Sequence, residues 1–364
     1  MIEKVSTART PENIYNTPPF ERSNAKEIVT EFCGKFQSHY ANNGYLAKEA
    51  VPVSSKVDPS VRLIGSHISV FKPELISRTV PKQGEFLVQD CIRTKNLRGL
   101  FDDAYVPGWG SSFTSLGALV PENGLNKATE DQIRFFTETL GIDIEDIRMR
   151  VSSEDVDLLE TCQRYLPEES LEVDTKDPNY YRHVIGIEGV RGRNYNMALR
   201  NPNGEGFSDV GNIILLEDNG GTLGVETAIG SSVVLKQMLN LNHVNDCYPI
   251  TGLEDVDPQF KRKIEDSLIV CTTLSREGLQ PRGSDNRERI MRSYMRALLY
   301  YSARTGISLD DLKNVSSMYE QTQFGTSDTQ ATNLIFEHLA SYAHDLRSGK
   351  INGKEDEIIS SVLI

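Results

Sequence analysis

Two stretches on either side of a polar loop decide the predicted fold: FLVQDCIR at 86–93 and SFTSLGALV at 112–120. Both are short runs that contain β-branched and aromatic residues, which is typical of β-strands. The residues between them, 94–111, include glycine, proline and several charged side chains, as loops do. The pattern therefore predicts two strands that pair as a hairpin.

Further strands are expected downstream of this hairpin. Residues 147–152 (IRMRVS) alternate in the way of a strand, and the segment 176–235 alternates strand-like runs with glycine-bearing turns. A helix is expected to close this segment, from Gly224 to about Asn240. The order of strand, turn and strand favours an antiparallel sheet over a doubly wound parallel one. The predicted fold class is therefore α+β.

Helical patterns lie on both sides of these strands. Residues 25–40 place apolar side chains at helical spacing, with Asn24 in front as the expected N-cap. A second helix is expected from Thr129 to 141, and 257–348 is predicted to be almost entirely helical. The predicted organisation is a flexible N-terminal arm at 1–24, a core at 25–253 and a helical domain at 254–364.

Composition limits the location and the partners of the chain. No run of about 18 consecutive apolar residues occurs, so no membrane span is expected. The five cysteines lie far apart without a CxxC pair, which indicates reduced thiols and a cytoplasmic location. A net charge of −13 counts against a protein that coats nucleic acid generally, but it leaves room for a local basic face.

Several segments, taken in chain order, have the residues and the spacing of one enzyme family. Asp58-Pro59 followed by Phe71-Lys72 resembles the "D-P … F-K" segment of alanyl-tRNA synthetases, which includes motif 1 of the class II synthetases. The residues 89–93 (QDCIR) look like the family's "Q-x-C-V-R" strand, the first half of motif 2. The predicted hairpin thus falls where the family has its motif 2 hairpin.

The resemblance continues to about residue 305. The return strand 113–117 (FTSLG) is similar to "F-E-M-L-G", and 211–215 (GNIIL) is similar to "W-N-L-V-F". The residues 223–226 (LGVE) fall where motif 3, "M-G-L-E-R", is expected. The segment 278–297 parallels part of the helical tRNA-recognition region of the family.

This resemblance implies an antiparallel class II sheet flanked by helices, followed by an all-α region that binds the tRNA acceptor stem. It also implies ATP with Mg²⁺ as cofactor and an amino acid or aminoacyl group as ligand. The family's editing domain, with its H-x-x-x-H zinc ligands, is absent, because the six histidines are scattered singly. No zinc and no other protein-bound metal site are expected.

The residues that chemistry of this kind requires are only partly present. Adenylate formation builds negative charge on phosphate oxygens, which fixed cations must stabilise. The resemblance assigns this role to Arg93 on motif 2, although pairing with the neighbouring Asp90 is an alternative. The second cation of the family, which opens the motif 3 helix, is replaced by Thr227. Gly220 stands where an aspartate should receive the substrate ammonium, and 107–111 (PGWGS) replaces "A-R-H-H-T". We therefore expect ordinary alanine activation to be lost.

Other residues are predicted to form an altered pocket. Arg191 and Arg193 enter a turn where the family has cysteines, and with Lys95 and Arg98 they are predicted to bind a phosphate-bearing ligand. A solvated loop with surface arginines is the alternative. Trp109 is predicted to stack on an adenine or a terminal base, or else to pack as a core anchor. The remaining predicted pocket residues are Thr114, Asn212, Asp218, Gly224 and Glu226.

A stripe of arginines marks the helix expected from Asp285 to about Ala303. Five arginines within fifteen residues of an acidic chain predict contact with a phosphate backbone, here that of tRNA. A salt-bridged surface is the alternative. The arginines are Arg282, Arg287, Arg289, Arg292 and Arg296.

Three functions remain open at this stage. The first is an enzyme, a ligase or transferase that handles an amino acid, its adenylate or an aminoacyl-tRNA in a specialised pathway. The second is a non-catalytic paralogue that binds the tRNA acceptor arm or a protein partner. The third is an ATP-dependent class II ligase with an acceptor other than tRNA.

Overall fold

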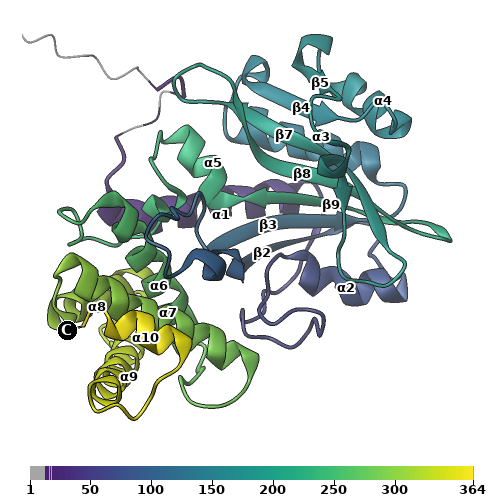
Figure 1. The fold of residues 1–364 in the computed structure, drawn as a ribbon. Coiled ribbons are helices and arrows are strands. Elements are labelled where there is room, and N and C mark those ends of the chain that lie inside the picture. Colours follow the sequence, from purple (N-terminus) through teal and green to yellow (C-terminus); the bar gives the residue numbers. More distant parts are fainter. Residues whose placement is uncertain (1–12, 16, 18, 364) are drawn as a thin grey trace, which may run out of the picture.

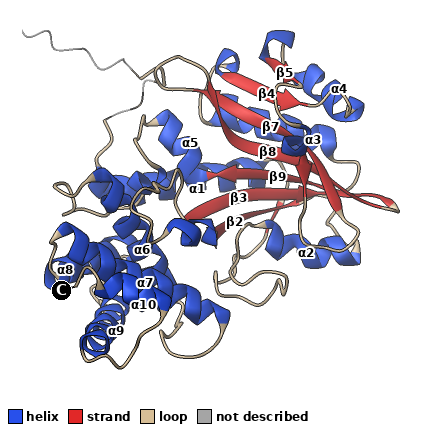
Figure 2. Ribbon diagram, viewed as in Figure 1, coloured by secondary structure: helices blue, strands red, loops and turns tan. Residues whose placement is uncertain are grey.

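The computed structural model describes residues 13–15, 17 and 19–363. Within this part of the chain, nine strands form one sheet in the order β1-β2-β3-β9-β8-β7-β4-β5, with β6 paired to β7 (Figures 1 and 2). All pairings are antiparallel except β1–β2 and β4–β5. The predicted α+β class with a mostly antiparallel sheet is confirmed. The strands are β1 (Leu46–Ala47), β2 (Glu85–Ile92), β3 (Ser112–Val120), β4 (Ile147–Val151), β5 (Leu171–Val173), β6 (Arg182–His183), β7 (Arg191–Arg200), β8 (Phe207–Asp218) and β9 (Gly221–Gly230).

Helices cover the sheet and then continue into a helical region beside one end of it (Figure 1). The first five are interleaved with the strands, and the last five follow one another along the chain. They are α1 (Ala25–Asn42), α2 (Ile68–Ser77), α3 (Leu125–Arg134), α4 (Val156–Tyr165), α5 (Ser231–Met238), α6 (Pro258–Arg276), α7 (Asn286–Thr305), α8 (Leu309–Phe324), α9 (Gln330–Arg347) and α10 (Lys354–Ser360).

The two faces of the sheet are packed differently. One face is buried over most of its area against α1, α3, α4 and α5, and Phe36 of α1 lies there with Leu116 and Val225. The other face is covered at one end by α2, where Phe71 packs with Leu216. Successive side chains of a strand point to opposite faces, so each central strand contributes to both layers. The rest of the second face carries the cavity described below.

The helical region shares its core with the loop that joins β2 to β3. Leu100 of this loop belongs to the same buried cluster as the apolar faces of α6 to α9, and so do Leu63 before α2 and Ile92 at the end of β2. The first helix of this region, α6, begins at Pro258, where the Asp257 side chain accepts a hydrogen bond from the Gln259 amide and caps the helix. The division into domains near residue 254 stays a prediction.

Two predicted helices are corrected by the structure. The helix expected from Gly224 begins only at Ser231, because residues 221–230 form β9, which is hydrogen-bonded to β3 on one side and to β8 on the other. Strand pairing on both sides overrides the local helical pattern. The helix expected from Thr129 begins earlier, at Leu125.

The first twelve residues of the predicted flexible arm lie outside the described residues. The described part of the arm is bound to the core. Asn13 donates to the Met238 carbonyl at 2.6 Å, and Arg22 donates to the Tyr248 carbonyl at 3.0 Å and pairs with the buried Glu265 at 2.6 Å. This stretch is therefore an anchored segment.

Gly117 on β3 is required by a close contact with an imidazole ring. A Cβ added to Gly117 would overlap the ring of His67, which is fully buried. We expect Gly117→Ala to lower the free energy of unfolding by about 1–3 kcal/mol, because the core has no room for the extra methyl group. Urea unfolding followed by circular dichroism measures the change.

Gly34 on α1 is the matched control, since nothing lies within 4 Å of a Cβ added there. Gly34→Ala is expected to be neutral or to stabilise by about 0.5–1 kcal/mol, because alanine loses less entropy in a helix. Equal effects of the two substitutions would contradict the proposed contact.

Candidate functional site

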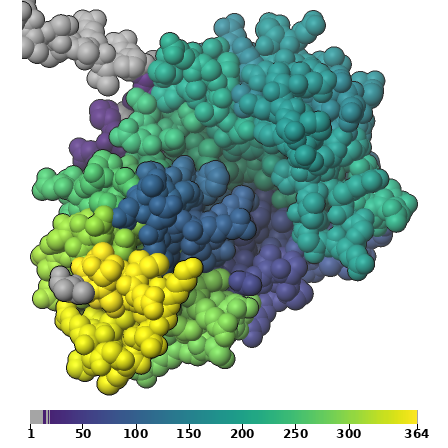
Figure 3. All heavy atoms as spheres, in the orientation of Figure 1, coloured from purple at the N-terminus to yellow at the C-terminus, as the bar shows by residue number. Residues whose placement is uncertain are grey.

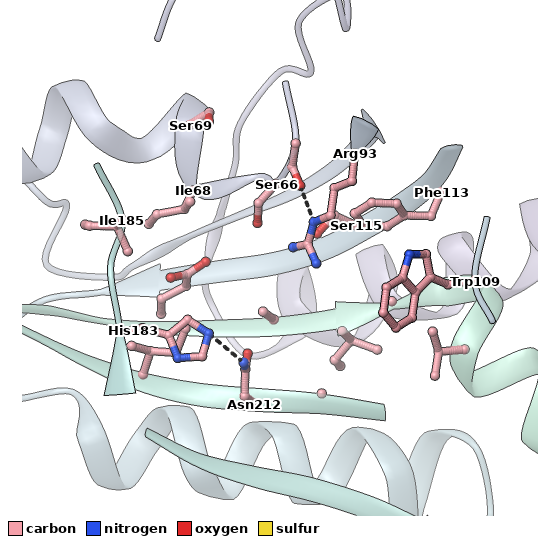
Figure 4. Close-up of a pocket in the computed structure, with 18 of the residues that line it drawn as sticks. Ser66, Ile68, Ser69, Arg93, Trp109, Phe113, Ser115, His183, Ile185 and Asn212 are labelled. Atoms are coloured by element: carbon pink, nitrogen blue, oxygen red, sulfur yellow. Dashed lines mark hydrogen bonds between the residues drawn. The ribbon is translucent and has the colours of Figure 1, made fainter. Parts of the chain in front are cut away.

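A cavity of about 810 Å³ lies on the open part of the second sheet face (Figure 4). Strands β3, β8 and β9 form its floor, and the N-terminal end of α2 and residues 183–186 form its walls. The two-residue period of β3 places Phe113 and Ser115 in the cavity and Leu116 in the core on the other face. In Figure 3 the loop 94–111, drawn in blue, lies between the teal strands and the green and yellow helices.

In one wall of the cavity, an ion pair joins Asp58 and Lys72, which are the two ends of the segment that resembles motif 1. The Nζ of Lys72 lies 2.5 Å from Asp58 and 2.8 Å from the Ser60 hydroxyl, and both charged side chains are buried. Ser69 also donates to Asp58, at 2.7 Å. The pair fixes the segment before α2 against the helix, and it leaves the Lys72 charge neutralised.

We call the open end of the cavity the outer pole; it consists of Arg93, Lys95, Trp109 and Phe113. The Nε of Arg93 donates to the Gly65 carbonyl at 2.8 Å, and its guanidinium carbon lies 5.0 Å from the centre of the Phe113 ring. Lys95 Nζ lies 5.7 Å from the ring of Trp109, which is 52% exposed. No carboxylate of the described residues pairs with Arg93, so the outer pole carries positive charge beside two aromatic faces.

The alternative pairing of Arg93 with Asp90 does not occur. Asp90 instead accepts a hydrogen bond from Thr114 at 2.7 Å. Thr114 alternates with the cavity residues Phe113 and Ser115 along β3 and therefore lies on the other face of the sheet. Its predicted place in the pocket is wrong.

The loop that carries Trp109 is held by helix α6. The carboxylate of Asp266 accepts the Ser111 amide at 2.6 Å and the Asn96 side-chain amide at 3.1 Å. Asn96 in turn donates to the Trp109 carbonyl at 2.9 Å. Burial raises the pKa of the Asp266 carboxyl above its ordinary value. Both ends of the loop thus depend on one buried acidic side chain of the helical region.

We call the closed end of the cavity the inner pole; it is built around Glu226, which is 2% exposed. One carboxylate oxygen, Oε1, lies 2.9 Å from Nε2 of His67, whose Nδ1 lies 2.8 Å from the Ser115 hydroxyl. The other oxygen, Oε2, is buried and has no hydrogen-bond partner among the described residues. A buried carboxylate with a free oxygen is suited to a cationic ligand group.

Three amide side chains and a histidine complete the inner pole. His183 Nδ1 lies 2.9 Å from Asn194 Oδ1. His183 Nε2 lies 3.4 Å from Asn212 Nδ2, as Figure 4 shows. The Oδ1 of Asn212 and the Nδ2 of Asn196 are buried without a partner in the described part of the chain. Sequence patterns did not identify His67, His183 or Asn196, because their proximity depends on strand register.

The four cations predicted to form one anion site are not brought together. Lys95 lines the cavity, and Arg98 is exposed on the loop after β2. Arg191 and Arg193 lie at the opposite end of the sheet, where Arg191 pairs with Glu217 in the strand register. Arg193 itself is bound by three carboxylates, those of Asp155, Asp157 and Glu217. The predicted shared anion site is therefore wrong.

The residues aligned with motif 3 lie in the β8–β9 hairpin. Gly220 is at its tip, where Asp218 pairs with Arg78 at 2.6 Å, outside the cavity lining. Gly224 packs against the carbonyl of Val120, where a Cβ would lie at 2.9 Å. Thr227 is buried and accepts the Ala118 amide, on the face opposite the cavity. Of this group, only Glu226 lines the cavity.

The helix opening that motif 3 requires is found at α5 instead. Gly230 precedes the helix, and Ser231 and Ser232 form its first residues. Ser232 lines the cavity. Neither of these two residues carries a positive charge.

The arginine stripe of α7 is only partly available to a ligand. Arg287 donates to the Arg62 carbonyl at 2.6 Å, and Arg296 pairs with Glu355 at 2.9 Å. Burial and the charges of Arg296 and Arg289 lower the pKa of Arg292. The arginines without an acidic partner within 4 Å among the described residues are Arg282, Arg289 and Arg292.

Searches for related proteins returned structural neighbours alone. No family model and no curated protein sequence matches this chain. Among solved structures, the RNA-binding domain of threonyl-tRNA synthetase from Cryptosporidium parvum has 11% identity and a TM-score of 0.41, over 78% of this chain and 83% of that one. A pyrrolysyl-tRNA synthetase from Desulfitobacterium hafniense has 11% identity and a TM-score of 0.37, over 60% and 71%.

The asparaginyl-tRNA synthetase of Entamoeba histolytica also has 11% identity and a TM-score of 0.37, over 63% of this chain and 66% of that one. The chain is thus similar in structure to class II aminoacyl-tRNA synthetases. A specific likeness to the alanyl enzyme stays a prediction. At these identities and TM-scores, function has to be derived from the cavity's own residues.

Two classes of feature were sought in the described part of the chain. No group of three or more histidine, cysteine or acidic side chains stands where it could hold a metal ion. None of the helices there combines the length and the apolar character needed to cross a lipid bilayer.

The stability of the loop at the outer pole depends on pH through His243. Its Nε2 donates to the Pro107 carbonyl at 2.9 Å, and its Nδ1 accepts the Asn245 amide at 3.1 Å. Burial lowers the pKa of His243 from 6.5 to about 4, so the folded protein binds this proton only in acid. The contribution of neutral His243 to the stability of the fold is complete above pH 6.5 and is lost as the pH falls toward 4.

We therefore expect the free energy of unfolding to fall by roughly 3 kcal/mol over this window through His243 alone. His243→Gln keeps a donor for Pro107 but does not titrate. The measurement is denaturant unfolding of both proteins at several values between pH 7 and pH 4. Parallel pH profiles for the two proteins would contradict this assignment.

Proposed function

We propose that the cavity binds an amino acid in activated form, as an aminoacyl adenylate or as the aminoacyl-adenosine end of a charged tRNA. The observation that supports this most directly is the opposite charge of its two poles. Among the described residues, Arg93 has no acidic partner at the open end, and one carboxylate oxygen of Glu226 has no hydrogen-bond partner at the closed end. A volume of about 810 Å³ lies within the usual range for small-molecule sites.

Each pole matches one part of such a ligand. The guanidinium of Arg93 can form two parallel hydrogen bonds to a phosphate group. The rings of Phe113 and Trp109 offer faces on which an adenine can stack. The carboxylate of Glu226, held by His67, is suited to the α-ammonium group of the amino acid.

The cation and the aromatic rings of the outer pole suit ATP itself. The carboxylates that line the cavity suit the magnesium ion of ATP less well. Magnesium is held mainly by carboxylate oxygens and phosphates. The carboxylates that line the cavity are those of Asp209 and Glu226, and both oxygens of Asp209 are already bound, by Arg150 and by the Tyr180 hydroxyl. We therefore assign no step of the function to a metal ion.

Ordinary alanine activation is not part of the proposal. Helix α5 opens with Ser231 and Ser232, without the cation that the family uses there. Loss of one such donor typically costs about 2.7–4 kcal/mol of transition-state stabilisation. The protein is instead proposed to handle an aminoacyl group in a specialised reaction, as a ligase or transferase.

The helical region is proposed to contact the acceptor stem of a tRNA. Arg282 and Arg289 are exposed and Arg292 is half-buried, and none of the three has an acidic partner within 4 Å among the described residues. Burial, followed by repulsion from Arg296 and Arg289, lowers the pKa of Arg292, and a phosphate bound nearby would offset the repulsion. A non-catalytic tRNA-binding paralogue would use the same surface.

The role of Arg93 is tested with sulfamoyl adenosines, which are stable analogues of aminoacyl adenylates. We expect Arg93→Gln to weaken their binding by about 10- to 100-fold, because one charge-assisted contact is lost. Isothermal titration calorimetry with alanyl, seryl and asparaginyl analogues measures the change. Arg98→Gln, on an exposed side chain outside the cavity, is the control and should bind as the wild type does. Absence of binding by the wild type would overturn the proposed function.

Contact with tRNA is tested by the salt dependence of binding. Replacing Arg282, Arg289 and Arg292 together by glutamine should weaken binding and reduce the slope of log K against log salt by about 2–3, one phosphate contact per arginine. Filter binding of total tRNA between 50 and 200 mM salt is suitable. The control replaces three exposed lysines outside the helical region and should leave the slope unchanged; these are Lys35, Lys82 and Lys176. An unchanged slope in the arginine variant would remove this surface from the proposal.

A further inference from the structure

We propose that the amino acid taken by this cavity has a neutral side chain with both a hydrogen-bond donor and an acceptor, that is, a hydroxyl or a carboxamide. The inference rests on the proposed function and specifies its substrate class. It is carried by Asn196 and Asn212, which stand beside Glu226 at the inner pole and have polar atoms without partners.

The two asparagines present opposite hydrogen-bonding groups side by side. Asn196 on β7 and Asn212 on β8 are direct cross-strand partners, and both line the cavity. Side chains of directly paired residues lie about 4.5–5.5 Å apart at their Cβ atoms. Asn212 Oδ1 is an acceptor and Asn196 Nδ2 is a donor, and both atoms are buried and free in the described structure.

A chain of hydrogen bonds fixes the polarity of Asn212. Asn194 donates its Nδ2 to the Tyr180 carbonyl at 3.3 Å, so its Oδ1 is an acceptor for the Nδ1–H of His183. The Nε2 of His183 then accepts from Asn212 Nδ2 at 3.4 Å. Rotating the Asn212 amide would place its oxygen against the Nε2 lone pair. The oxygen of Asn212 therefore remains its unpaired atom, on a residue that lines the cavity.

The side chain of the substrate decides whether these atoms are satisfied. The methyl group of alanine leaves Asn196 and Asn212 both unpaired, and buried polar groups without partners are disfavoured. A carboxylate side chain would be repelled by the Glu226 carboxylate and by the oxygen of Asn212. A hydroxyl or carboxamide supplies one donor and one acceptor. Sites built in this way discriminate strongly against analogues that lack the group.

The test compares three sulfamoyl adenosines that differ only in the aminoacyl side chain. Isothermal titration calorimetry of the full-length protein should give the seryl or the asparaginyl analogue an affinity at least about 10-fold above that of the alanyl analogue. In Asn212→Leu this ratio should fall to about one. Asn314→Leu, on an exposed position of α8, is the matched control and should retain the wild-type ratio.

A second variant keeps the test decisive if the leucine substitution prevents folding. Asn196→Asp preserves the volume and exchanges the donor for an acceptor, and it should also reduce the ratio. If the alanyl analogue binds as tightly as both polar ones, this inference is wrong while the proposed function stands. If no analogue binds, the proposed function is wrong and the inference falls with it.

Discussion

The position of β9 between β3 and β8 is the constraint on which the site depends. Hydrogen bonds on both sides make β9 a central strand, and the two-residue period then assigns its side chains to opposite faces. Val225 therefore lies in the core under α1, and Glu226 lines the cavity. A shift of one residue in this register would exchange the two and bury a carboxylate in an apolar core.

The helical region is physically joined to the cavity through the loop between β2 and β3. Two buried side chains of α6 hold this loop: Asp266 accepts from Asn96 and Ser111 near its two ends, and Lys263 donates to the Gly99 carbonyl between them. Trp109 at the outer pole is therefore positioned by contacts with helices that lie far from it in the sequence. Helix α6 thus connects the helical region with the mouth of the cavity. This connection links the proposed tRNA surface to the proposed aminoacyl site without a further element.

The inner pole has more polar atoms than an alanine pocket requires. Among the described residues, Glu226, Asn196 and Asn212 each have a buried atom without a hydrogen-bond partner. Nε2 of His67 lies 2.9 Å from Glu226, and His183 is hydrogen-bonded to Asn212. Maintaining such groups costs stability unless a ligand satisfies them. Helix α5 opens with Ser231 and Ser232, so the charged side chains of the cavity are concentrated at its two poles rather than at this helix.

The sequence by itself determined the elements with strong local patterns: the strands 86–93 and 112–120, the helix at 25–40 and the helical region from 257. It also predicted five residues that the structure places in the lining of the cavity, namely Arg93, Lys95, Trp109, Asn212 and Glu226. Only the tertiary structure decided that β9 extends to Gly230, that Arg193 is neutralised by three carboxylates, and that Asn196 faces Asn212. These facts depend on strand register and on contacts between distant residues, and local periodicity contains no information about either.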